Sequence, residues 1–262
     1  MLSEIVQSSN LNVSLEPAII AQHADFIVVA KPPHLLSHPT RPDGKPTLLG
    51  WLQEKIPGEF IALVNRLDRE TSGTILAARS PEAASRLGYM TMHREIHKHY
   101  LALVAGCVDV EHGMIDAPIG RLGISEQNPI WLRQGVIPPD DPQGRKTAEA
   151  RSEYWLLAAN DSVSLLRLQA HTGRLHQLRV HLAHIGHPVL GDKIYGPDPN
   201  LYLKFIAEGW TEEHQRVLGL SRHALHAHEM RFAWNGEDLT FTAPLPEDLR
   251  TSLPNSIWER TC

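Results

Sequence analysis

The sequence predicts an α+β fold in which helices flank one mixed, mostly antiparallel sheet. Three observations support this class. Short apolar runs rich in β-branched residues recur along the chain and outnumber the stretches with helical periodicity. The connections between these runs are mixed in character, which argues against a regular alternation of strand and helix. An asparagine–glycine pair near the C-terminal end separates two strand-like segments, as in a β-hairpin.

The first predicted elements are a buried strand and a short helix. Residues 25–30 form an apolar run rich in β-branched side chains, which is typical of a buried strand. The run ends at Lys31-Pro32-Pro33, because proline has no N–H group to donate to a sheet. Residues 34–46 are rich in proline and are predicted to form a loop. A short helix is predicted over residues 48–56, with its leucines at 48, 49 and 52 facing inward.

A polar loop follows between two predicted strands, residues 60–64 and 74–78. Next, Ser80-Pro81 favours the start of a helix, with serine as the N-cap and proline in the first turn, and this helix is predicted to end near residue 93. Residues 98–105 are predicted to form a strand. Its alternation places Lys98 and Tyr100 on one face.

The C-terminal half predicts more strands and one amphipathic helix. Residues 118–144 are rich in proline, glycine and polar residues, and we expect an extended connection there. Residues 151–157 and 162–170 are predicted to form a pair of strands. A helix over residues 175–185 would present one apolar stripe made of Leu175, Leu178, Leu182 and Ile185.

Two segments complete the chain. Residues 198–218 form a polar excursion with some helical character. Residues 226–232 and 239–243 are predicted to form a final hairpin around Asn235-Gly236.

The composition is that of an ordinary globular protein, with 42% hydrophobic and 21% charged residues. No run of about 18 apolar residues exists, so we expect no membrane span. The N-terminus lacks the pattern of a signal peptide, and the two cysteines form neither a ligand spacing nor a disulfide framework. We therefore expect a cytoplasmic protein. We also expect a monomer, because no long exposed apolar stripe calls for a partner.

The charge is unevenly distributed along the chain. The net charge is −5 and the pI is about 6.3, which excludes a protein that binds nucleic acid through bulk charge alone. From residue 198 onward ten acids stand against six bases, whereas residues 66–98 hold six bases and four acids. A polyanion would therefore bind to a local basic patch near the polar loop. The alternative is that these bases form an ordinary solvent-exposed face with no partner.

The polar loop holds the first candidate for chemistry. Asp68 lies between Arg66 and Arg69, ahead of the small-residue turn Thr71-Ser72-Gly73. Nearby positive charge favours an ionised carboxylate, which suits a nucleophile or a base better than a general acid. A surface loop with ordinary ion pairs is the alternative, and composition alone favours it.

Two further candidates lie outside the loop. The aromatic ring of Tyr100 and the cation of Lys98 could stack a base and hold a phosphate, although a core tyrosine is the more frequent case. Arg179 lies at the margin of the apolar stripe, where a partly buried arginine needs an anion. Asp68 is a candidate partner, and an exposed arginine is the alternative.

Histidines are numerous, at 16. His181 and His184 lie three residues apart on the predicted helix and could hold a metal with a third ligand. No carboxylate or cysteine falls at a matching step in this segment. We therefore expect no metal, and packing, capping or phosphate contacts for these histidines.

Three blocks of sequence resemble the RluA family of pseudouridine synthases, in the order in which that family carries them. Weaker matches extend the resemblance over roughly residues 24 to 246. The three blocks are Arg66-Leu67-Asp68-x-x-Thr71-Ser72-Gly73, Lys98-x-Tyr100-x-Ala102-x-Val104 and the segment from Gly173 to Asp192.

The resemblance implies one pseudouridine synthase catalytic domain with a central cleft, which isomerises uridine in RNA to pseudouridine without a cofactor or metal. It implies that Asp68 is the catalytic aspartate, acting as a nucleophile or as a base at the ribose. Tyr100 would stack on the flipped uracil, Arg179 would pair with Asp68, and Leu178 would pack against the base. Arg66 would enter the RNA stack in place of the flipped nucleotide.

The resemblance leaves several points open. We expect residues 24–250 to form the catalytic domain, between an N-terminal extension (1–23) and a C-terminal tail (251–262), with no S4-type RNA-binding domain. Asn65 stands where the family usually has histidine, and we expect a structural role for it. The RNA is transfer RNA or large-subunit ribosomal RNA. The alternatives are an idle RNA-binding or RNA-folding module on the same scaffold and an aspartate-dependent N-glycoside hydrolase.

Overall fold

The computed structural model describes residues 16–40, 44–123 and 129–252. The chain divides into two compact units, each described by itself below. The described part of the loop unit comprises residues 16–40, 44–100 and 225–252, and that of the α4 unit comprises residues 101–123 and 129–224. Strand β5 (His97–Ala105) begins in the loop unit and continues in the α4 unit. Within the described ranges, no helix combines the length and the apolar character that a membrane crossing needs.

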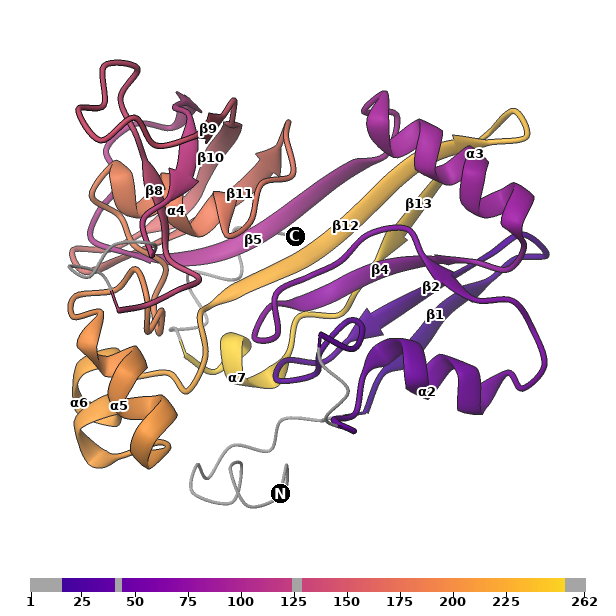
Figure 1. Ribbon diagram of the computed structural model, residues 1–262, viewed down its shortest axis with the longest axis horizontal. Coiled ribbons are helices and arrows are strands. Elements are labelled where there is room, and N and C mark those ends of the chain that lie inside the picture. The colour runs from indigo at the N-terminus through magenta and orange to yellow at the C-terminus, as the bar shows by residue number, and fades with distance from the viewer. Residues whose placement is uncertain (1–15, 41–43, 124–128, 253–262) are drawn as a thin grey trace. The chain divides into compact units, whose positions relative to one another are not determined.

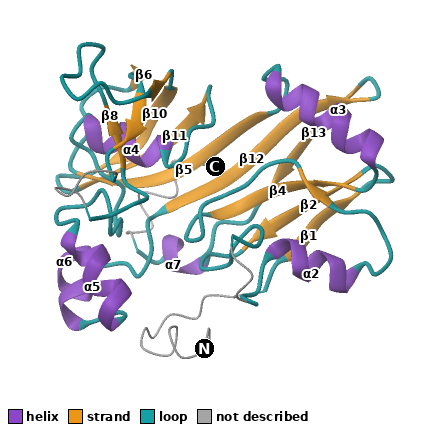
Figure 2. Ribbon diagram, viewed as in Figure 1, coloured by secondary structure: helices purple, strands orange, loops and turns teal. Residues whose placement is uncertain are grey.

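The loop unit is a mixed sheet with helices packed against it (Figures 1 and 2). Strand β2 lies antiparallel between β1 and β4, and β4 pairs in parallel with β12. Strands β3 and β13 pair antiparallel with β4 and β12. The strands of this unit are β1 (Ala18–Gln22), β2 (Phe26–Lys31), β3 (Ala62–Leu63), β4 (Ser72–Ala78), β12 (Leu225–Trp234) and β13 (Glu237–Thr242), and its helices are α2 (Leu48–Lys55), α3 (Pro81–Met92) and α7 (Glu247–Arg250).

Both faces of β2 and β4 are covered. Helix α3 packs against one set of alternate residues of these strands, and helix α2 packs against the other set. Phe26, Val28 and Leu76 pack in one cluster with Leu87 of α3. Their neighbours Ile27, Val29 and Ile75 pack in a second cluster with Leu48 and Leu52 of α2. This two-sided burial explains why residues 25–30 are a continuous apolar run in place of an alternating one.

The α4 unit contains a second set of strands. Strand β10 lies antiparallel between β6 and β11, and a separate small sheet has the order β8-β7-β9. Helix α4 packs against β8, β10 and β11. The strands are β6 (His112–Asp116), β7 (Ile119–Arg121), β8 (Gln134–Val136), β9 (Thr147–Ala148), β10 (Arg151–Ala159) and β11 (Val163–Ala170), and the helices are α4 (Gln177–His184), α5 (Asn200–Glu208) and α6 (Glu212–Leu218).

The predicted class, α+β with a mostly antiparallel sheet, is confirmed, and most elements lie where the sequence predicts them. The side chain of Ser80 caps α3, since its oxygen accepts a bond from the Ala83 N–H (3.0 Å). The hairpin turns at Asn235 and Gly236, whose φ angles of 53° and 87° are both in the left-handed region. The central cleft and the domain boundaries stay predictions, and β1 lies ahead of the boundary expected at residue 24.

Four segments differ from the prediction. The strand predicted over residues 60–64 is reduced to Ala62–Leu63. Leu49 is only half-buried on α2. The helix predicted from residue 175 begins at Gln177, so the stripe is wrong at Leu175, which is 44% exposed. Part of segment 118–144 forms β7 and β8.

Candidate active site

The loop that carries Asp68 begins where β3 leaves the sheet. The Val64 N–H still donates to the Leu76 carbonyl (2.8 Å), as a strand residue does. At the next position the buried side chain of Asn65, and not its backbone, forms the hydrogen bonds to β4. Its Oδ1 accepts from the Leu76 N–H (2.8 Å), and its Nδ2 donates to the Thr74 carbonyl (3.4 Å). The side chain therefore bonds to the edge of β4 while the backbone of Arg66 departs from it.

Two side chains, one from the last residue of β2 and one from the segment after it, hold the other side of the loop. The Ser37 hydroxyl donates to the Leu67 carbonyl (3.0 Å) and accepts from the Leu67 N–H (3.1 Å). The ammonium of Lys31 is buried and donates to the carbonyls of Leu35 (2.9 Å) and Arg69 (3.2 Å). The residues on both sides of Asp68 are thus fixed through their backbone atoms.

The far end of the loop is pressed against β12. His226 Nε2 lies 3.2 Å from the Ala243 carbonyl, so this nitrogen donates and His226 Nδ1 accepts from the Ser72 hydroxyl (2.9 Å). Gly73 has φ +119°, and a Cβ atom there would lie 2.1 Å from the Ala227 carbonyl oxygen. Only glycine permits this close approach of the two strands.

Tyr100 is the predicted site residue that the structure relates to Asp68. Burial and the negative charge of Asp68 together raise the pKa of the Tyr100 phenol to about 12. The phenol therefore stays protonated at neutral pH and can donate a hydrogen bond. Two residues earlier on β5, burial lowers the pKa of Lys98 to about 8, so its charge titrates close to neutral pH.

The arginines on either side of Asp68 bind other groups. Arg66 is exposed, and its Nη1 lies 2.8 Å from His38 Nε2. Because His38 Nδ1 lies 2.7 Å from the Pro39 carbonyl, Nδ1 donates and Nε2 is left to accept from Arg66. Arg69 Nε donates to the His34 carbonyl (3.2 Å). In these contacts each arginine is bound to a group other than a carboxylate, and the ion-paired surface loop stays an alternative.

Arg179 lies in the α4 unit and is held by a buried ion pair with Asp192. Its Nε and Nη2 donate to the two carboxylate oxygens at 2.6 and 2.8 Å. The backbone N–H groups of Ile194 and Tyr195 also donate to Asp192, at 2.9 and 3.0 Å. Burial alone would raise the pKa of Asp192, but Arg179 and these N–H groups outweigh burial and lower it. The guanidinium also lies over the Tyr195 ring, 5.0 Å from its centroid.

The start of α4 is fixed by a glutamine. Gln177 accepts from the Thr172 hydroxyl (2.6 Å) and donates to the Arg151 carbonyl (2.9 Å). The residue before it, His176, has a left-handed φ of 58°, which ends the loop and starts the helix two residues later than its apolar pattern predicts. Leu178 and Arg179 therefore fall in the first, buried turn.

His181, one of the two histidines of this helix, has protein partners. His181 is fully buried, and its Nδ1 and Nε2 lie 2.9 Å from the Ser152 hydroxyl and the Ala117 carbonyl. Burial lowers its pKa. In the described ranges, no three histidine, cysteine, aspartate or glutamate side chains are placed to hold a metal ion. Packing, one of the expected roles, is therefore the observed one for His181.

The six predicted site residues fall into two groups. Arg66, Asp68, Lys98 and Tyr100 belong to the loop unit, and there Asp68 acts electrostatically on Tyr100. Leu178 and Arg179 belong to the α4 unit. The pairing of Arg179 with Asp68 stays a prediction.

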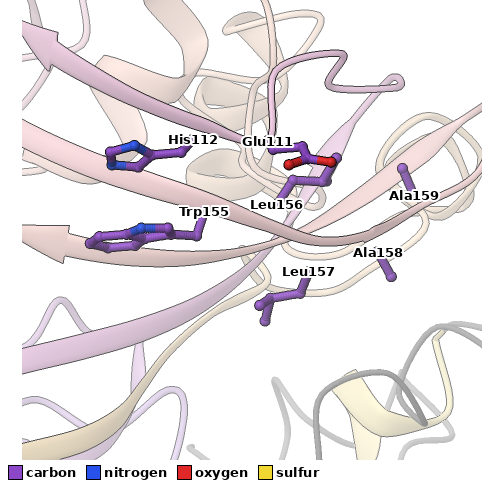
Figure 3. A pocket seen from close by; sticks show the side chains of 7 residues that line it. All are labelled: Glu111, His112, Trp155, Leu156, Leu157, Ala158 and Ala159. Carbon is purple, nitrogen blue, oxygen red and sulfur yellow. The ribbon is translucent and has the colours of Figure 1, made fainter.

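A pocket of the α4 unit holds none of these six residues. It lies where β6 begins beside β10 and is lined by Glu111, His112 and residues 155–159 (Figure 3). The rings of His112 and Trp155 stack there, with their centroids 5.2 Å apart. Arg167 covers the Trp155 ring at 4.7 Å, so neighbouring side chains already occupy the aromatic surface.

The sequence interpretation missed the residues that hold the site together. Asp192 ends the third block and carries a charge, yet no role was predicted for it. His226 lies in one of the weaker matches to the family, and Ser37 lies in a loop judged only by its prolines. The signal in the sequence was a charged residue directly after Gly191, at the end of the third block. The structure shows that this charge is buried.

The chain is similar to several known proteins. A family model described as RNA pseudouridylate synthase matches residues 25–184. A "Ribosomal large subunit pseudouridine synthase D" of Nitrosomonas europaea is 33% identical over 90% of this chain and 64% of its own length, so the chain spans about two thirds of that relative. An "Uncharacterized RNA pseudouridine synthase YjbO" of Bacillus subtilis is 32% identical over 88% of this chain and 73% of its own length.

A solved structure is also similar. "Human RNA Pseudouridylate Synthase Domain Containing 1" superposes with a TM-score of 0.68 at 26% identity, over 97% of this chain and 98% of that one.

Proposed function

Because the chain belongs to the RNA pseudouridylate synthase family, we propose that it isomerises specific uridines in RNA to pseudouridine, with Asp68 as the catalytic carboxylate. The observation that carries this proposal is the loop of the first block. It holds a carboxylate by its backbone neighbours, and the charge of this carboxylate acts on a half-buried, protonated tyrosine. A carboxylate and a neutral phenol can serve a reaction that detaches and reattaches a base.

The proposed reaction breaks the bond between N1 of uracil and C1′ of the ribose and forms a bond from C5 to C1′. Asp68 acts at the ribose, as a nucleophile at C1′ or as a base. Tyr100 lies beside the flipped uracil, stacks on it and donates a hydrogen bond to the charge that develops on the detached base. The C5 proton leaves in the last step, and N1 gains a proton, so the base keeps its formula.

We assign supporting roles to the remaining residues. Arg179, which Asp192 holds in place, would pair with Asp68 and orient it, and Leu178 would pack against the base. Arg66 would enter the RNA stack, and the ammonium of Lys98 would contact a phosphate.

The substrate is proposed from the names of relatives. Relatives named as ribosomal large subunit synthases favour large-subunit ribosomal RNA over transfer RNA. The same bacterial relatives favour a cytoplasmic location. The reaction as proposed needs no metal, so turnover should persist in excess EDTA, and we expect a monomer in gel filtration with light scattering.

A tritium-release assay tests the proposed function. RNA labelled with tritium at C5 of uridine is incubated with the purified chain, with Asp68→Asn and with Glu70→Gln. The second variant removes a neighbouring carboxylate from the same loop as a matched control. We expect release with the wild type and Glu70→Gln, and a loss of about four orders of magnitude with Asp68→Asn, because the reacting group itself is removed.

Three results would contradict the proposal. Ordinary turnover by Asp68→Asn would show that another residue does the chemistry. No release from any RNA by the wild type would favour an idle RNA-binding module, and release of free uracil would favour an N-glycoside hydrolase.

A further inference from the structure

We propose that one end of the small sheet in the α4 unit is an RNA-binding surface, on which the Trp131 ring stacks a base and three cations bind phosphates. This proposal rests on the proposed function. The surface would give the enzyme a second contact with its substrate, at a single-stranded RNA segment other than the modified nucleotide. We call it the Trp131 surface, and it consists of Arg121, Trp131, Arg133 and Lys146.

The register of the small sheet brings the three cations together. Strand β7 ends at Arg121, which pairs with Gln134 at the start of β8. Arg133 comes one residue before Gln134, and its carbonyl accepts from the Leu122 N–H (2.9 Å). On the other side, Gly120 pairs with Thr147, so Lys146 lies across from Arg121. Each of the three strands thus contributes one cation to the same end of the sheet.

These cations have no anionic partner within the described part of the chain. Arg121, Arg133 and Lys146 form no salt bridge there, and the buried Nε of Arg133 has no hydrogen-bond partner. Arg145 of the same segment is different, because its guanidinium binds Asp141 at 2.6 Å. Three unpaired cations at one site in a chain of net charge −5 form a local positive patch that complements a polyanion.

The aromatic ring at this end is exposed and held in place. Trp131 is 60% exposed, and the Arg121 guanidinium lies 4.7 Å from its centroid. A planar guanidinium on an exposed indole is an arrangement that stacks bases and contacts phosphates. An acidic protein segment would match the charge, but it would leave the indole without a partner.

The backbone around Trp131 is anchored to the core of the unit. Ile130, the residue before it, is buried in a cluster with Ile119 and Val180. A Cβ atom on Gly123 would lie 2.1 Å from the Ile130 carbonyl oxygen, so the two segments are in direct contact. On the other side, the Gln134 N–H donates to the Tyr195 hydroxyl (3.0 Å). The ring therefore projects from a fixed position, which lowers the entropy cost of binding.

The test measures binding of a fluorescein-labelled single-stranded RNA of mixed sequence by fluorescence anisotropy, over a series of salt concentrations. We expect Trp131→Ala to bind about tenfold more weakly at one salt concentration, because one stacked base is lost. Trp131→Phe keeps a ring and should stay within about threefold of the wild type. The double variant Arg121→Ala/Arg133→Ala should lower the slope of log K against log salt by about 1.4, which corresponds to two phosphate contacts.

Two matched variants serve as controls. Arg145→Ala removes a cation that is already ion-paired and should leave the salt slope unchanged. Tyr89→Ala removes an aromatic ring of similar exposure, 55%, from the loop unit and should leave affinity unchanged. Thermal unfolding of each variant checks that it is folded.

The proposal is overturned if folded Trp131→Ala binds as the wild type does, or if Tyr89→Ala loses as much affinity as Trp131→Ala. It is also overturned if the double variant keeps the wild-type salt slope, which would leave an acidic protein as the partner of the cations. These outcomes are separate from a failure of the proposed function. That failure would be the absence of pseudouridine formation by the wild type, whatever the role of Trp131 in binding.

Discussion

The Asp68 loop and the start of α4 each hold a charged side chain with a proposed role in the reaction, and they do so in different ways. Side chains hold the loop by its backbone, through Lys31, Ser37 and Asn65. At α4 the charged side chain itself is held, because Arg179 is bound to an aspartate with no exposed surface. The comparison teaches that Asp68 can be altered with little effect on folding, whereas Arg179 contributes to the reaction and to stability at once.

The largest expected effect concerns the buried ion pair. Asp192→Ala would leave the Arg179 guanidinium buried without its anion, so the free energy of unfolding should fall by about 3–5 kcal/mol. Chemical denaturation followed by circular dichroism measures it. The double variant Asp192→Leu/Arg179→Met removes both charges and should recover much of the loss. If Asp192→Ala lowered the free energy of unfolding by less than about 1 kcal/mol, the ion pair at α4 would not contribute to stability, and the two regions would not differ in this respect.

The second prediction concerns the join between the loop and β12. Gly73→Ala would place a methyl group against the Ala227 carbonyl and force a side chain into φ +119°. We expect the free energy of unfolding to fall by about 2–4 kcal/mol and pseudouridine formation to fall with it, because the loop must shift. Gly88→Ala, on α3 with open space around its Cβ, is the matched control and should be neutral or stabilising. Equal behaviour of the two variants would show that the close approach is not needed.

The third prediction separates the two hydrogen bonds of His38. His38→Gln can keep an acceptor for Arg66, whereas His38→Asn keeps a donor for the Pro39 carbonyl and loses that acceptor. If His38 orients Arg66 for RNA, His38→Asn should raise KM for RNA about fivefold with little change in kcat. His38→Gln should stay within about twofold of the wild type. The opposite ranking would assign the contribution of His38 to its Pro39 bond.

The smallest expected effect is a pH dependence of binding. Burial lowers the pKa of Lys98 to about 8, so this side chain is charged at pH 7 and mostly neutral at pH 9. If it contacts a phosphate, RNA affinity should fall about threefold as pH rises through 8, and Lys98→Gln should bind weakly at both pH values. The Tyr100 phenol, with a pKa of about 12, stays protonated over this range and adds no pH dependence. An equal decline in Lys98→Gln would assign the effect to another group.

Local sequence signals were enough for most of the fold. A serine followed by proline marks the start of α3, and an asparagine followed by glycine marks the last hairpin, because each pair satisfies a backbone requirement within a few residues. The start of α4 was mispredicted because Leu175 extends the apolar stripe. The left-handed φ of His176, which ends the loop, leaves no pattern in the sequence.

The site was predicted less completely, because its supports lie far apart in the sequence. Three motif blocks predict which residues react, but they do not show that Arg66 contacts His38, 28 residues away, or that Ser72 contacts His226, 154 residues away. Such bonds depend on tertiary packing, which no local period encodes. The spacing of Asp68 and its arginines likewise does not show that Arg69 contacts His34, 35 residues away.

The most direct test maps pseudouridines across the total RNA of a strain that lacks the gene, complemented with the wild type or with Asp68→Asn. We predict that at least one site disappears in the deletion strain, returns with the wild type and stays absent with Asp68→Asn, although the variant protein is folded and binds RNA. Return of the site with Asp68→Asn would contradict the assignment of the chemistry to the loop. An unchanged map in the deletion strain would contradict the proposed activity itself.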